Sequence, residues 1–275
     1  MKPLKIDPAL KADGSESVCA GMSKNIYSFV PFDNVYEDAD RANAYAKLEF
    51  PGTYYLAYRD LPQIISEHVK GKKALDFGCG TGRSTRFLRN LGFNVIGVDI
   101  ARDMIRKAVE CDPAGEYHLI EDGILSRFVG GAYDLVLSAF TFDNIPTSKR
   151  KVKNFRAIRS LLKPDGKMVN LVSSPEIYTH EWASFTTKDF PENRHAGSGD
   201  RVKIIMTDVE DRRPVEDILW TDEAYREVYQ QAKLELVKTY KPLAKESEPF
   251  AWVNETRIAP WVIYVLKQEH PVTKQ

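Results

Sequence analysis

Three glycines stand two residues apart in the segment ALDFGCGTGRS, residues 74–84, directly after a short apolar run. Glycine has no side chain, so a glycine-rich turn lets the backbone come close to a bound molecule. A helix that begins after such a turn directs free N–H groups and the positive end of its dipole at that molecule. The segment therefore predicts a ligand-binding turn between a strand and a helix.

The spacing of the glycines separates two ligand classes that are bound at such turns, dinucleotides and S-adenosylmethionine. A dinucleotide turn carries the pattern GxGxxG, in which the third glycine allows close helix packing. Here Gly78, Gly80 and Gly82 form GxGxG, and Arg83 occupies the position of that third glycine. The spacing favours S-adenosylmethionine.

Two acidic residues flank this turn. Asp76 precedes it, where a carboxylate would repel a pyrophosphate and attract the ammonium group of a methionine moiety. Asp99 ends the next apolar run, where an acid can accept hydrogen bonds from both ribose hydroxyls of either ligand class. Asp76 thus supports S-adenosylmethionine, and Asp99 does not distinguish the two classes.

Apolar strands and amphipathic helices alternate from residue 73 onward. We expect strands at 73–78, 94–100, 117–122, 133–140 and 167–174, helices at 82–92, 101–110 and 148–163, and a turn at 164–166. This order predicts an α/β fold with a doubly wound, mostly parallel sheet. Beyond it we expect an antiparallel hairpin near 201–220, a helix at 221–233 capped by Thr221, and strands at 234–241 and 261–268.

The quoted motifs resemble a known family. LDFGCGTGRSTRFL together with VIGVDIARDMI resembles the class I S-adenosylmethionine-dependent methyltransferases, and YDLVLSAFTFDNI and LLKPDGKMV match that family's fourth-strand and fifth-strand patterns. The resemblance covers residues 70–175. It implies a Rossmann-like sheet of seven strands, with an antiparallel last strand beside the fifth. It also implies S-adenosyl-L-methionine as cofactor and methyl transfer to N or O of a small molecule.

The resemblance also implies which residues contact the cofactor, all at the carboxyl ends of the strands. The implied contacts are Asp76 near the amino group, Gly78, Cys79 and Gly80 under the methionine and ribose, Asp99 on the ribose, Ile100 and Met104 on the adenine, Asp122 and Gly123 at the adenine amino group, and Ser138, Ala139 and Phe140 on the methionine side. For Met104, an ordinary place in the core is the alternative.

The chain divides into three expected parts of a single domain: 1–60 as a tail and aromatic lid, 61–175 as the cofactor-binding core, and 176–275 as a substrate-side insert with the closing strands. Tyrosines and phenylalanines crowd into residues 27–58. They form either a lid over the cofactor or a hydrophobic staple that holds the N-terminal segment down. Trp182 and Trp252 stand in loop-like sequence and are expected to line the acceptor pocket, whereas Trp220 and Trp261 are expected in the core.

A general base is needed only when the acceptor arrives protonated. His180 and His195 are the candidates, because histidine titrates near neutral pH and both follow the fifth strand. The alternative for each is an ordinary surface position. Methyl transfer leaves no required catalytic signature, so a cofactor-binding protein without catalysis stays open as a further interpretation, as does a nicotinamide-dependent oxidoreductase.

Charge and composition limit the partners. The 275 residues include 39 Lys+Arg and 39 Asp+Glu, and this neutral balance disfavours a dedicated nucleic-acid binder. The basic run at 148–163 is interpreted as the solvated face of a helix, and a phosphate-binding patch for tRNA is the minor alternative. A protein substrate is a further alternative for the acceptor. Members of the family that methylate base amino groups carry prolines where this chain reads SAFTFDN.

Three widely spaced cysteines indicate neither a disulfide framework nor a zinc site, and we expect no bound metal. The N-terminal residues lack the apolar core of a signal peptide, and no apolar run is long enough to cross a membrane. The sequence therefore predicts a cytoplasmic enzyme whose partner is a small-molecule methyl acceptor.

Overall fold

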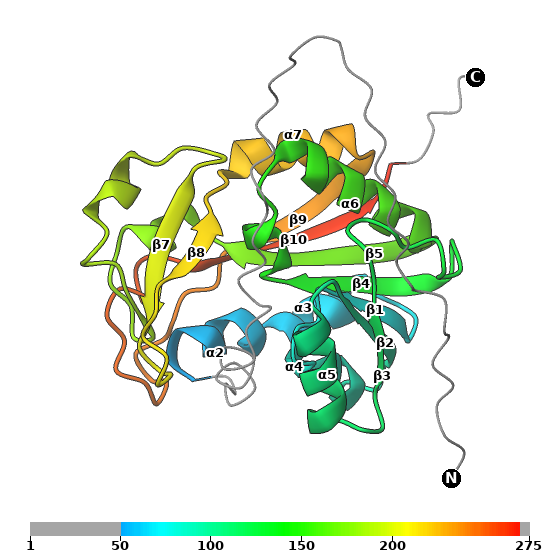
Figure 1. Ribbon diagram of the computed structural model, residues 1–275, viewed down its shortest axis with the longest axis horizontal. Coiled ribbons are helices and arrows are strands. Elements are labelled where there is room, and N and C mark those ends of the chain that lie inside the picture. The colour runs from blue at the N-terminus through cyan, green and yellow to red at the C-terminus, as the bar shows by residue number, and fades with distance from the viewer. Residues whose placement is uncertain (1–50, 270–275) are drawn as a thin grey trace, which may run out of the picture. The chain divides into compact units, whose positions relative to one another are not determined.

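Seven strands form one sheet through the part of the chain that the structure, a computed structural model, describes: residues 51–269. Their order is β3-β2-β1-β4-β5-β10-β9 (Figure 1). The strands are β1 (Lys73–Phe77), β2 (Asn94–Asp99), β3 (Glu116–Leu119), β4 (Tyr133–Ala139), β5 (Leu162–Ser173), β9 (Leu234–Tyr240) and β10 (Trp261–Gln268). The first five are parallel, and β10 runs antiparallel to both β5 and β9. The predicted doubly wound sheet, with its antiparallel last strand beside the fifth, is confirmed.

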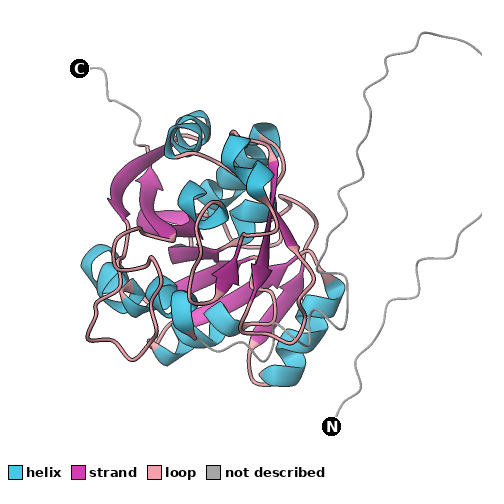
Figure 2. Cartoon of the chain, turned by 90° about the vertical axis from the view of Figure 1, so that its left-hand side faces the viewer, coloured by secondary structure: helices cyan, strands magenta, loops and turns pink. Residues whose placement is uncertain are grey.

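Helices cover both faces of this sheet, as Figure 2 shows. They are α2 (Gly52–Arg59), α3 (Leu61–His68), α4 (Arg83–Asn90), α5 (Arg102–Cys111), α6 (Ser148–Leu161) and α7 (Asp222–Gln231). Ala74 of β1 belongs to the apolar cluster that contains residues of α3 and α4, whereas its neighbour Leu75 belongs to the cluster of α6 and α7. Successive strand residues point to opposite faces, so each strand contributes to both halves of the core.

Two helix boundaries lie at capping residues that are recognisable in the sequence. The Thr221 hydroxyl accepts a hydrogen bond from the backbone N–H of Ala224 at 3.3 Å, which confirms the predicted cap of α7. Gly92, just after α4, has φ 81°, a left-handed conformation that glycine adopts at little cost. The α4 helix therefore ends where the glycine was expected to end it.

The predicted turn at 164–166 lies inside β5 and not between α6 and the strand: a Cβ at Gly166 would lie 3.0 Å from the backbone N and O of Lys163. β5 begins at Leu162, directly after α6, and its pairing with β4 shifts register between Tyr133 and Leu135. Gln268 at the end of β10 donates to the Leu162 carbonyl at 2.6 Å, and the Lys163 ammonium lies 2.8 Å from Asp134 of β4. These contacts keep the segment against the sheet, so the PDG residues form an irregularity within the strand.

A small second sheet lies between β5 and α7 in the sequence. It consists of β6 (Phe185–Thr186), β7 (Arg201–Met206) and β8 (Val215–Ile218), and short 3-10 helices occur at η1 (Thr141–Asn144), η2 (Pro175–Tyr178) and η3 (Pro191–His195). β7 and β8 pair antiparallel, which confirms the predicted hairpin. Figure 1 shows this sheet beyond the carboxyl ends of β4 and β5, the end of the large sheet where a ligand is expected.

A buried carboxylate ties α2 to the C-terminal part of the chain. Glu255 has no exposed surface and accepts hydrogen bonds from the Thr53 hydroxyl and the Ala183 N–H, both at 2.7 Å. Tyr54, the next residue of α2, is buried and stacks on Trp261 with 5.7 Å between ring centroids. The aromatic residues of α2 therefore act as a hydrophobic staple; the remainder of the predicted lid, residues 27–50, lies outside the described residues.

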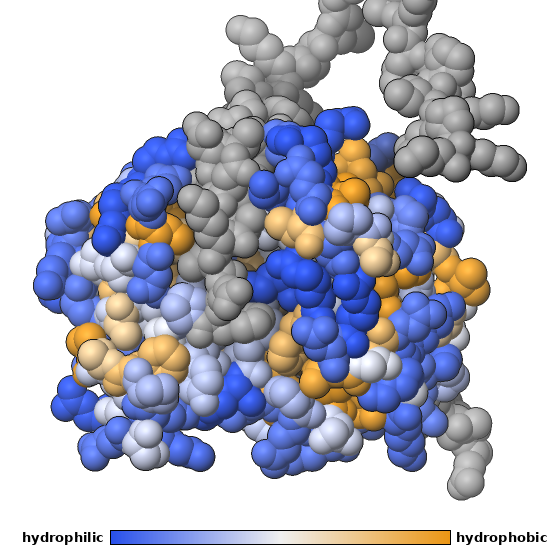
Figure 3. Space-filling model, turned by 90° about the horizontal axis from the view of Figure 1, so that it is seen from below, coloured by the Kyte–Doolittle hydropathy of each residue, from blue (hydrophilic) through white to orange (hydrophobic). Residues whose placement is uncertain are grey.

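None of the helices within residues 51–269 is long and apolar enough to span a bilayer. The face of the molecule seen in Figure 3 carries mostly hydrophilic side chains with separate apolar patches between them. Scattered apolar groups of this kind are usual on protein surfaces.

Candidate functional site at the glycine loop

The loop 78–82 joins β1 to α4 and is held by the neighbouring strand. The N–H groups of Gly78 and Cys79 both donate to the Val98 carbonyl of β2, at 2.8 and 2.9 Å. Gly82, the N-cap of α4, has φ 82° and its N–H donates to the Cys79 carbonyl. The loop is thus a tight turn at the carboxyl ends of β1 and β2, as the sequence predicts.

The glycines of the loop differ in what surrounds them. A Cβ atom at Gly78 would collide with the side chain of Thr141, and one at Gly82 would lie 2.6 Å from the Tyr117 hydroxyl. A Cβ at Gly80, where φ is 52°, would meet no atom of the described residues within 4 Å. Gly78 and Gly82 therefore serve packing, and Gly80 presents bare backbone to a space that none of residues 51–269 fills.

Asp76 is completely buried beneath the loop. Its Oδ2 accepts hydrogen bonds from the hydroxyls of Ser84 and Thr85, both at 2.6 Å, while its Oδ1 has no partner among residues 51–269. Burial raises the pKa of Asp76 to about 6, against the lowering effect of the two hydroxyls. A buried carboxylate oxygen without a donor is the feature that a ligand's ammonium group would satisfy.

Asp99 ends β2 on the other side of the loop. Its Oδ2 accepts from the Gly80 N–H and its Oδ1 from the Ala101 N–H, each at 2.8 Å. Burial raises the pKa of Asp99, and these backbone donors oppose the rise. Each carboxylate oxygen can accept a second hydrogen bond, so the side chain shapes the loop and still has capacity for ligand hydroxyls.

Two apolar residues near Asp99 fit the predicted adenine side. Met104 is buried and clusters with Ala101, apart from the two main clusters of the core that the described residues form. Ile100 is half-buried and packs against the cluster of α6 and α7. Met104 therefore lies apart from the main core, which was the alternative to an adenine contact.

Asp122 and Gly123 are held by α6. The Asp122 carboxylate accepts from the Arg150 guanidinium at 3.1 Å and from the Asn154 amide at 3.0 Å, and its carbonyl accepts from Lys153. A Cβ at Gly123, where φ is 67°, would lie 2.9 Å from Cε of Lys153. Any ligand contact of Asp122 shares the carboxylate with two side chains of α6.

The end of β4 carries the third predicted group of residues. Ser138 has no exposed surface and its hydroxyl finds no partner within residues 51–269, whereas Ala139 is half-buried. Phe140 adopts φ 63°, a conformation that costs a non-glycine residue about 1–3 kcal/mol, and such strain clusters at functional sites. Its ring lies 4.8 Å from that of Trp261 and 5.7 Å from that of Tyr54.

Sequence reasoning missed Thr141, the first residue of η1. Its hydroxyl donates to the carbonyl of Phe77 at 2.9 Å, and the Gly78 carbonyl lies at 3.2 Å. The side chain fills the space that the absent Cβ of Gly78 leaves. A small polar residue directly after the fourth strand was the available signal, since the ends of parallel strands meet at one edge of a sheet.

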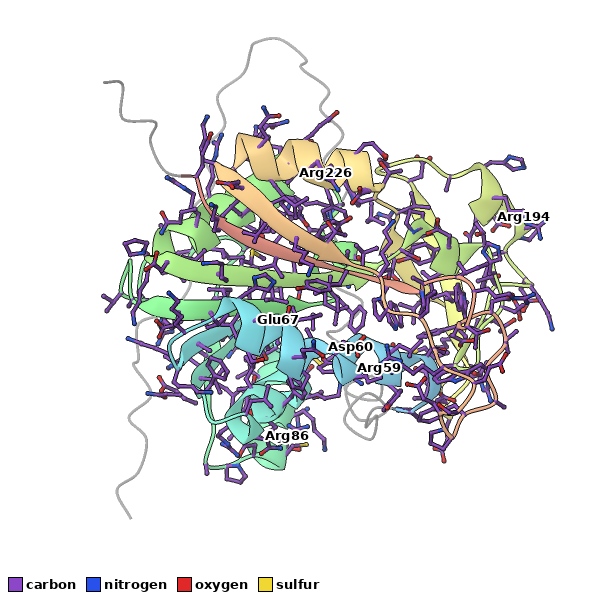
Figure 4. All side chains as sticks on the ribbon, turned by 180° about the vertical axis from the view of Figure 1, so that it is seen from behind. Arg59, Asp60, Glu67, Arg86, Arg194 and Arg226 are labelled. Carbon is purple, nitrogen blue, oxygen red and sulfur yellow. The ribbon has the colours of Figure 1, made fainter. Side chains whose placement is uncertain are left out.

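The two candidate histidines do not meet the glycine loop. His180 lies two residues after η2, with Nδ1 3.0 Å from the Thr179 hydroxyl and 3.1 Å from the Glu176 carbonyl. His195 is exposed at the end of η3. Figure 4 shows its neighbour Arg194 at the outer margin of the small sheet, far from Arg86 of α4. No hydrogen bond or ring contact joins either histidine to residues 78–82, so both roles stay predictions without structural support.

The two tryptophans that were expected to line the acceptor pocket lie in different environments. Trp182 is 4% exposed and its indole N–H donates to the Ile177 carbonyl at 2.9 Å, so it belongs to the core. The expectation that it lines an open pocket is wrong, because loop-like sequence here folds into packed structure. Trp252 is half-buried, with its N–H on the Lys245 carbonyl at 3.1 Å.

Comparisons with known proteins agree with this geometry. The sequence model of the methyltransferase domain matches residues 52–201. A ubiquinone biosynthesis O-methyltransferase from Burkholderia thailandensis is 26% identical over 199 residues, which cover 70% of this chain and 77% of that protein.

Two solved structures share the fold. The CcbJ methyltransferase from Streptomyces caelestis aligns with a TM-score of 0.57 at 18% identity, over 83% of this chain and 96% of that one. An S-adenosylmethionine-dependent methyltransferase from Clostridium acetobutylicum aligns with a TM-score of 0.56 at 16% identity, over 82% and 94%. The chain belongs to the methyltransferase-domain family and has the fold of the class I methyltransferases.

Proposed function

We propose that this enzyme moves a methyl group to N or O of a small molecule, with the cofactor bound on the open side of the glycine loop. The placement rests on Gly80, where a Cβ would meet no atom of the described residues within 4 Å and whose N–H binds the Asp99 carboxylate, together with the Oδ1 of Asp76, which has no partner among residues 51–269. A side chain at this position of the loop would exclude a ligand from this space. The position also agrees with the carboxyl-end rule for parallel sheets.

The residues present fit S-adenosylmethionine. Asp76 offers its free oxygen to the amino group, Asp99 offers its remaining acceptor capacity to the ribose hydroxyls, and Met104 with Ile100 offers an apolar surface to the adenine. Cys79 contributes backbone, because burial raises the pKa of its thiol well above the usual value and leaves it protonated.

The cofactor supplies a methyl group already activated on a sulfonium. What the protein adds is orientation and exclusion of water. An acceptor that reaches the site with a free lone pair needs no base, which agrees with the absence of a histidine contact to residues 78–82.

Phe140, half-buried at the end of β4, supports a small, largely apolar acceptor. Its ring packs on the buried rings of Trp261 and Tyr54, with 4.8 and 5.7 Å between centroids, so the core fixes its position. An aromatic ring with an exposed part suits a planar or apolar molecule. The relative from Burkholderia thailandensis is named for O-methylation in ubiquinone biosynthesis, an activity on a small molecule.

The contacts of four basic residues in the run at 148–163 do not favour the alternative of a tRNA substrate. Arg150 and Lys153 bind Asp122, Arg156 donates to the Gln231 carbonyl, and Lys163 pairs with Asp134. Cations engaged in this way are less available to track phosphates. A cytoplasmic site of action stays part of the proposal, supported by two free thiols, Cys79 and Cys111, which suit a reducing compartment.

Radiolabelled methyl transfer tests the acceptor class. We expect label from S-adenosylmethionine to enter a member of a panel of phenols, amines and carboxylates, and not bulk tRNA or protein. Label only in RNA or protein would contradict the proposal. Cofactor binding without transfer to any of the three classes would favour the non-catalytic interpretation instead.

The pH dependence of cofactor binding tests the role of Asp76. In the free protein burial raises the pKa of Asp76 to about 6, so the carboxyl is protonated below that pH, while an α-ammonium keeps its proton up to about pH 7.7. Binding the ammonium requires the carboxylate, so affinity should rise as pH increases from 5 to 7, by up to about tenfold per unit below pH 6.

The same raised pKa fixes the sign for stability. A carboxyl whose folded pKa exceeds the unfolded value contributes stability at low pH that is lost as pH rises through about 6.

Calorimetric titrations at pH 5, 6 and 7 measure the affinity for the cofactor, with Asp76→Asn as the control that lacks the titrating group. A wild-type affinity that is flat over this range would remove Asp76 from the amino-group site.

A further inference from the structure

A lysine on α6 is buried where the sequence suggests a solvated face. Lys151 has no exposed surface, although it stands in the basic run at 148–163, so the solvated-face interpretation is wrong for it. Its ammonium donates to the Phe142 carbonyl of η1. The ammonium also lies 4.8 Å from the ring of Trp220 and 5.2 Å from that of Tyr225. Removing such a group from water is costly unless partners compensate.

Two buried carboxylates from different segments raise the pKa of Lys151 by their charge and so oppose the effect of its burial. Asp143 belongs to η1, is 4% exposed, and accepts from the Ser173 N–H at the end of β5 at 3.0 Å. Asp217 belongs to β8, is 9% exposed, and accepts from the Tyr178 hydroxyl of η2 at 3.0 Å. The charges of Asp143 and Asp217 therefore favour the ammonium of Lys151, whose direct hydrogen bond is to the Phe142 carbonyl of η1, and η1 itself contacts β8.

This cluster is joined to the glycine loop through η1. Its second and third residues, Phe142 and Asp143, are held by Lys151 and Ser173. Its first residue, Thr141, donates to the carbonyl of Phe77 and packs into the space at Gly78. A shift of η1 at one end must move the contacts at the other, because the segment is only four residues long.

The ionisation of the cluster favours a neutral total charge. Burial raises the pKa of Asp217 to about 8 and that of Asp143 to about 6, and it lowers the pKa of Lys151 to about 7. The other groups facing it are Tyr178 of η2 and Tyr225 of α7, whose pKa values burial raises well above normal, and Glu216, which raises the pKa of Asp217 further. One protonated carboxyl, one carboxylate and one ammonium avoid a net buried charge.

We propose that Lys151 is a positioning residue for methyl transfer: with Asp143 and Asp217 it sets η1, and through Thr141 the cofactor-binding side of the glycine loop. The inference rests on the proposed placement of the cofactor at that loop. Lys151 contacts no substrate. It acts by keeping the Phe142 carbonyl and the Asp143 carboxylate in place.

The first test separates positioning from simple stabilisation. Lys151→Met removes the positive charge, and Lys151→Met/Asp143→Asn also removes the buried negative charge that the first change leaves uncompensated. Melting temperature, cofactor dissociation constant, and kcat with KM are measured for both. The exposed Lys149 on the same helix gives the matched control, Lys149→Met.

We expect Lys151→Met to lower Tm and weaken cofactor binding by about tenfold or more, since a buried donor to η1 is lost. The double variant should regain most of the Tm but not the affinity, because the Phe142 carbonyl still lacks its donor. Affinity that returns together with Tm, or a Lys151→Met protein that binds like Lys149→Met, would overturn the proposal. Failure of the wild-type protein to bind the cofactor would instead overturn the proposed function.

A second variant keeps the test open if Lys151→Met does not fold. Asp217→Asn mimics the protonated carboxyl, so position 217 carries no charge at any pH. The wild-type protein should lose cofactor affinity relative to Asp217→Asn by about tenfold between pH 7.5 and 9.5, as Asp217 ionises. The ratio of the two dissociation constants is used because the cofactor's own ammonium titrates in both. A ratio that stays constant over this range would contradict the proposal.

Discussion

Gly80→Val is expected to abolish measurable binding of S-adenosylmethionine while the protein remains folded. The side chain would enter the open space beside Gly80, where no atom of the described residues lies within 4 Å of a Cβ. A branched side chain there occupies the place of the ligand, so affinity should fall by more than about a hundredfold, or about 3 kcal/mol. Calorimetric titration measures the loss.

The control for this variant has to carry the same backbone strain. Gly131, in the turn before β4, has φ 64°, close to the 52° of Gly80, and a Cβ there would also meet no atom of the described part of the chain within 4 Å. Valine at either position pays the penalty of a left-handed conformation, about 1–2 kcal/mol. Gly131→Val should therefore lose similar stability and keep full affinity. If Gly80→Val binds as well as Gly131→Val, the cofactor does not lie at this loop.

Asp99→Ala should have the second-largest effect. The change removes the proposed acceptor of the ribose hydroxyls and also leaves the N–H groups of Gly80 and Ala101 without their partner. Loss of one side of such pairs costs about 1–3 kcal/mol, so affinity should fall by about 5- to 150-fold. Because the loop also loosens, the melting temperature should decline as well.

Asp103, on the first turn of α5, gives the matched control. Its carboxylate pairs with Arg106 on the surface of the helix, and exposed pairs of this kind contribute little. Asp103→Ala should leave both affinity and melting temperature close to those of the wild type. An Asp99→Ala protein that is folded and binds the cofactor normally would refute the ribose assignment.

The part of the site that could be predicted is the part that depends on residues close together in the sequence. The spacing of Gly78, Gly80 and Gly82 after an apolar strand, with Asp99 at the end of the next strand, specifies a turn and an acid at one edge of a parallel sheet. The structure places these residues together as expected. Helix caps such as Thr221 were predictable for the same reason, since a cap depends on residues three positions apart.

Lys151 was missed although a local signal existed. It stands four residues before Phe155 and seven before Ile158, which is the spacing of one helix face, and both of those residues are fully buried. A lysine on an apolar stripe indicates a buried cation more than a solvated one. Its partners could not be predicted, because Asp143 and Asp217 come from separate elements that only tertiary packing brings together.

The environments of the residues expected at the acceptor pocket could not be predicted either, because they also depend on tertiary packing. Trp182 and His180 stand in sequence without periodicity, and only the packing of η2 against the small sheet buries one and leaves the other in its own turn. Loop residues take their environment from distant segments, as the contacts of Glu255 with Thr53 and Ala183 show.

Calorimetric titration of the purified protein with S-adenosylmethionine, S-adenosylhomocysteine and NADH, in parallel, tests the central claim most directly. The glycine spacing, the unpartnered oxygen of Asp76 and the open side of Gly80 predict binding of the first two ligands and none of NADH. Binding of NADH, or of none of the three, would contradict the placement of S-adenosylmethionine at this loop and the residue roles that depend on it.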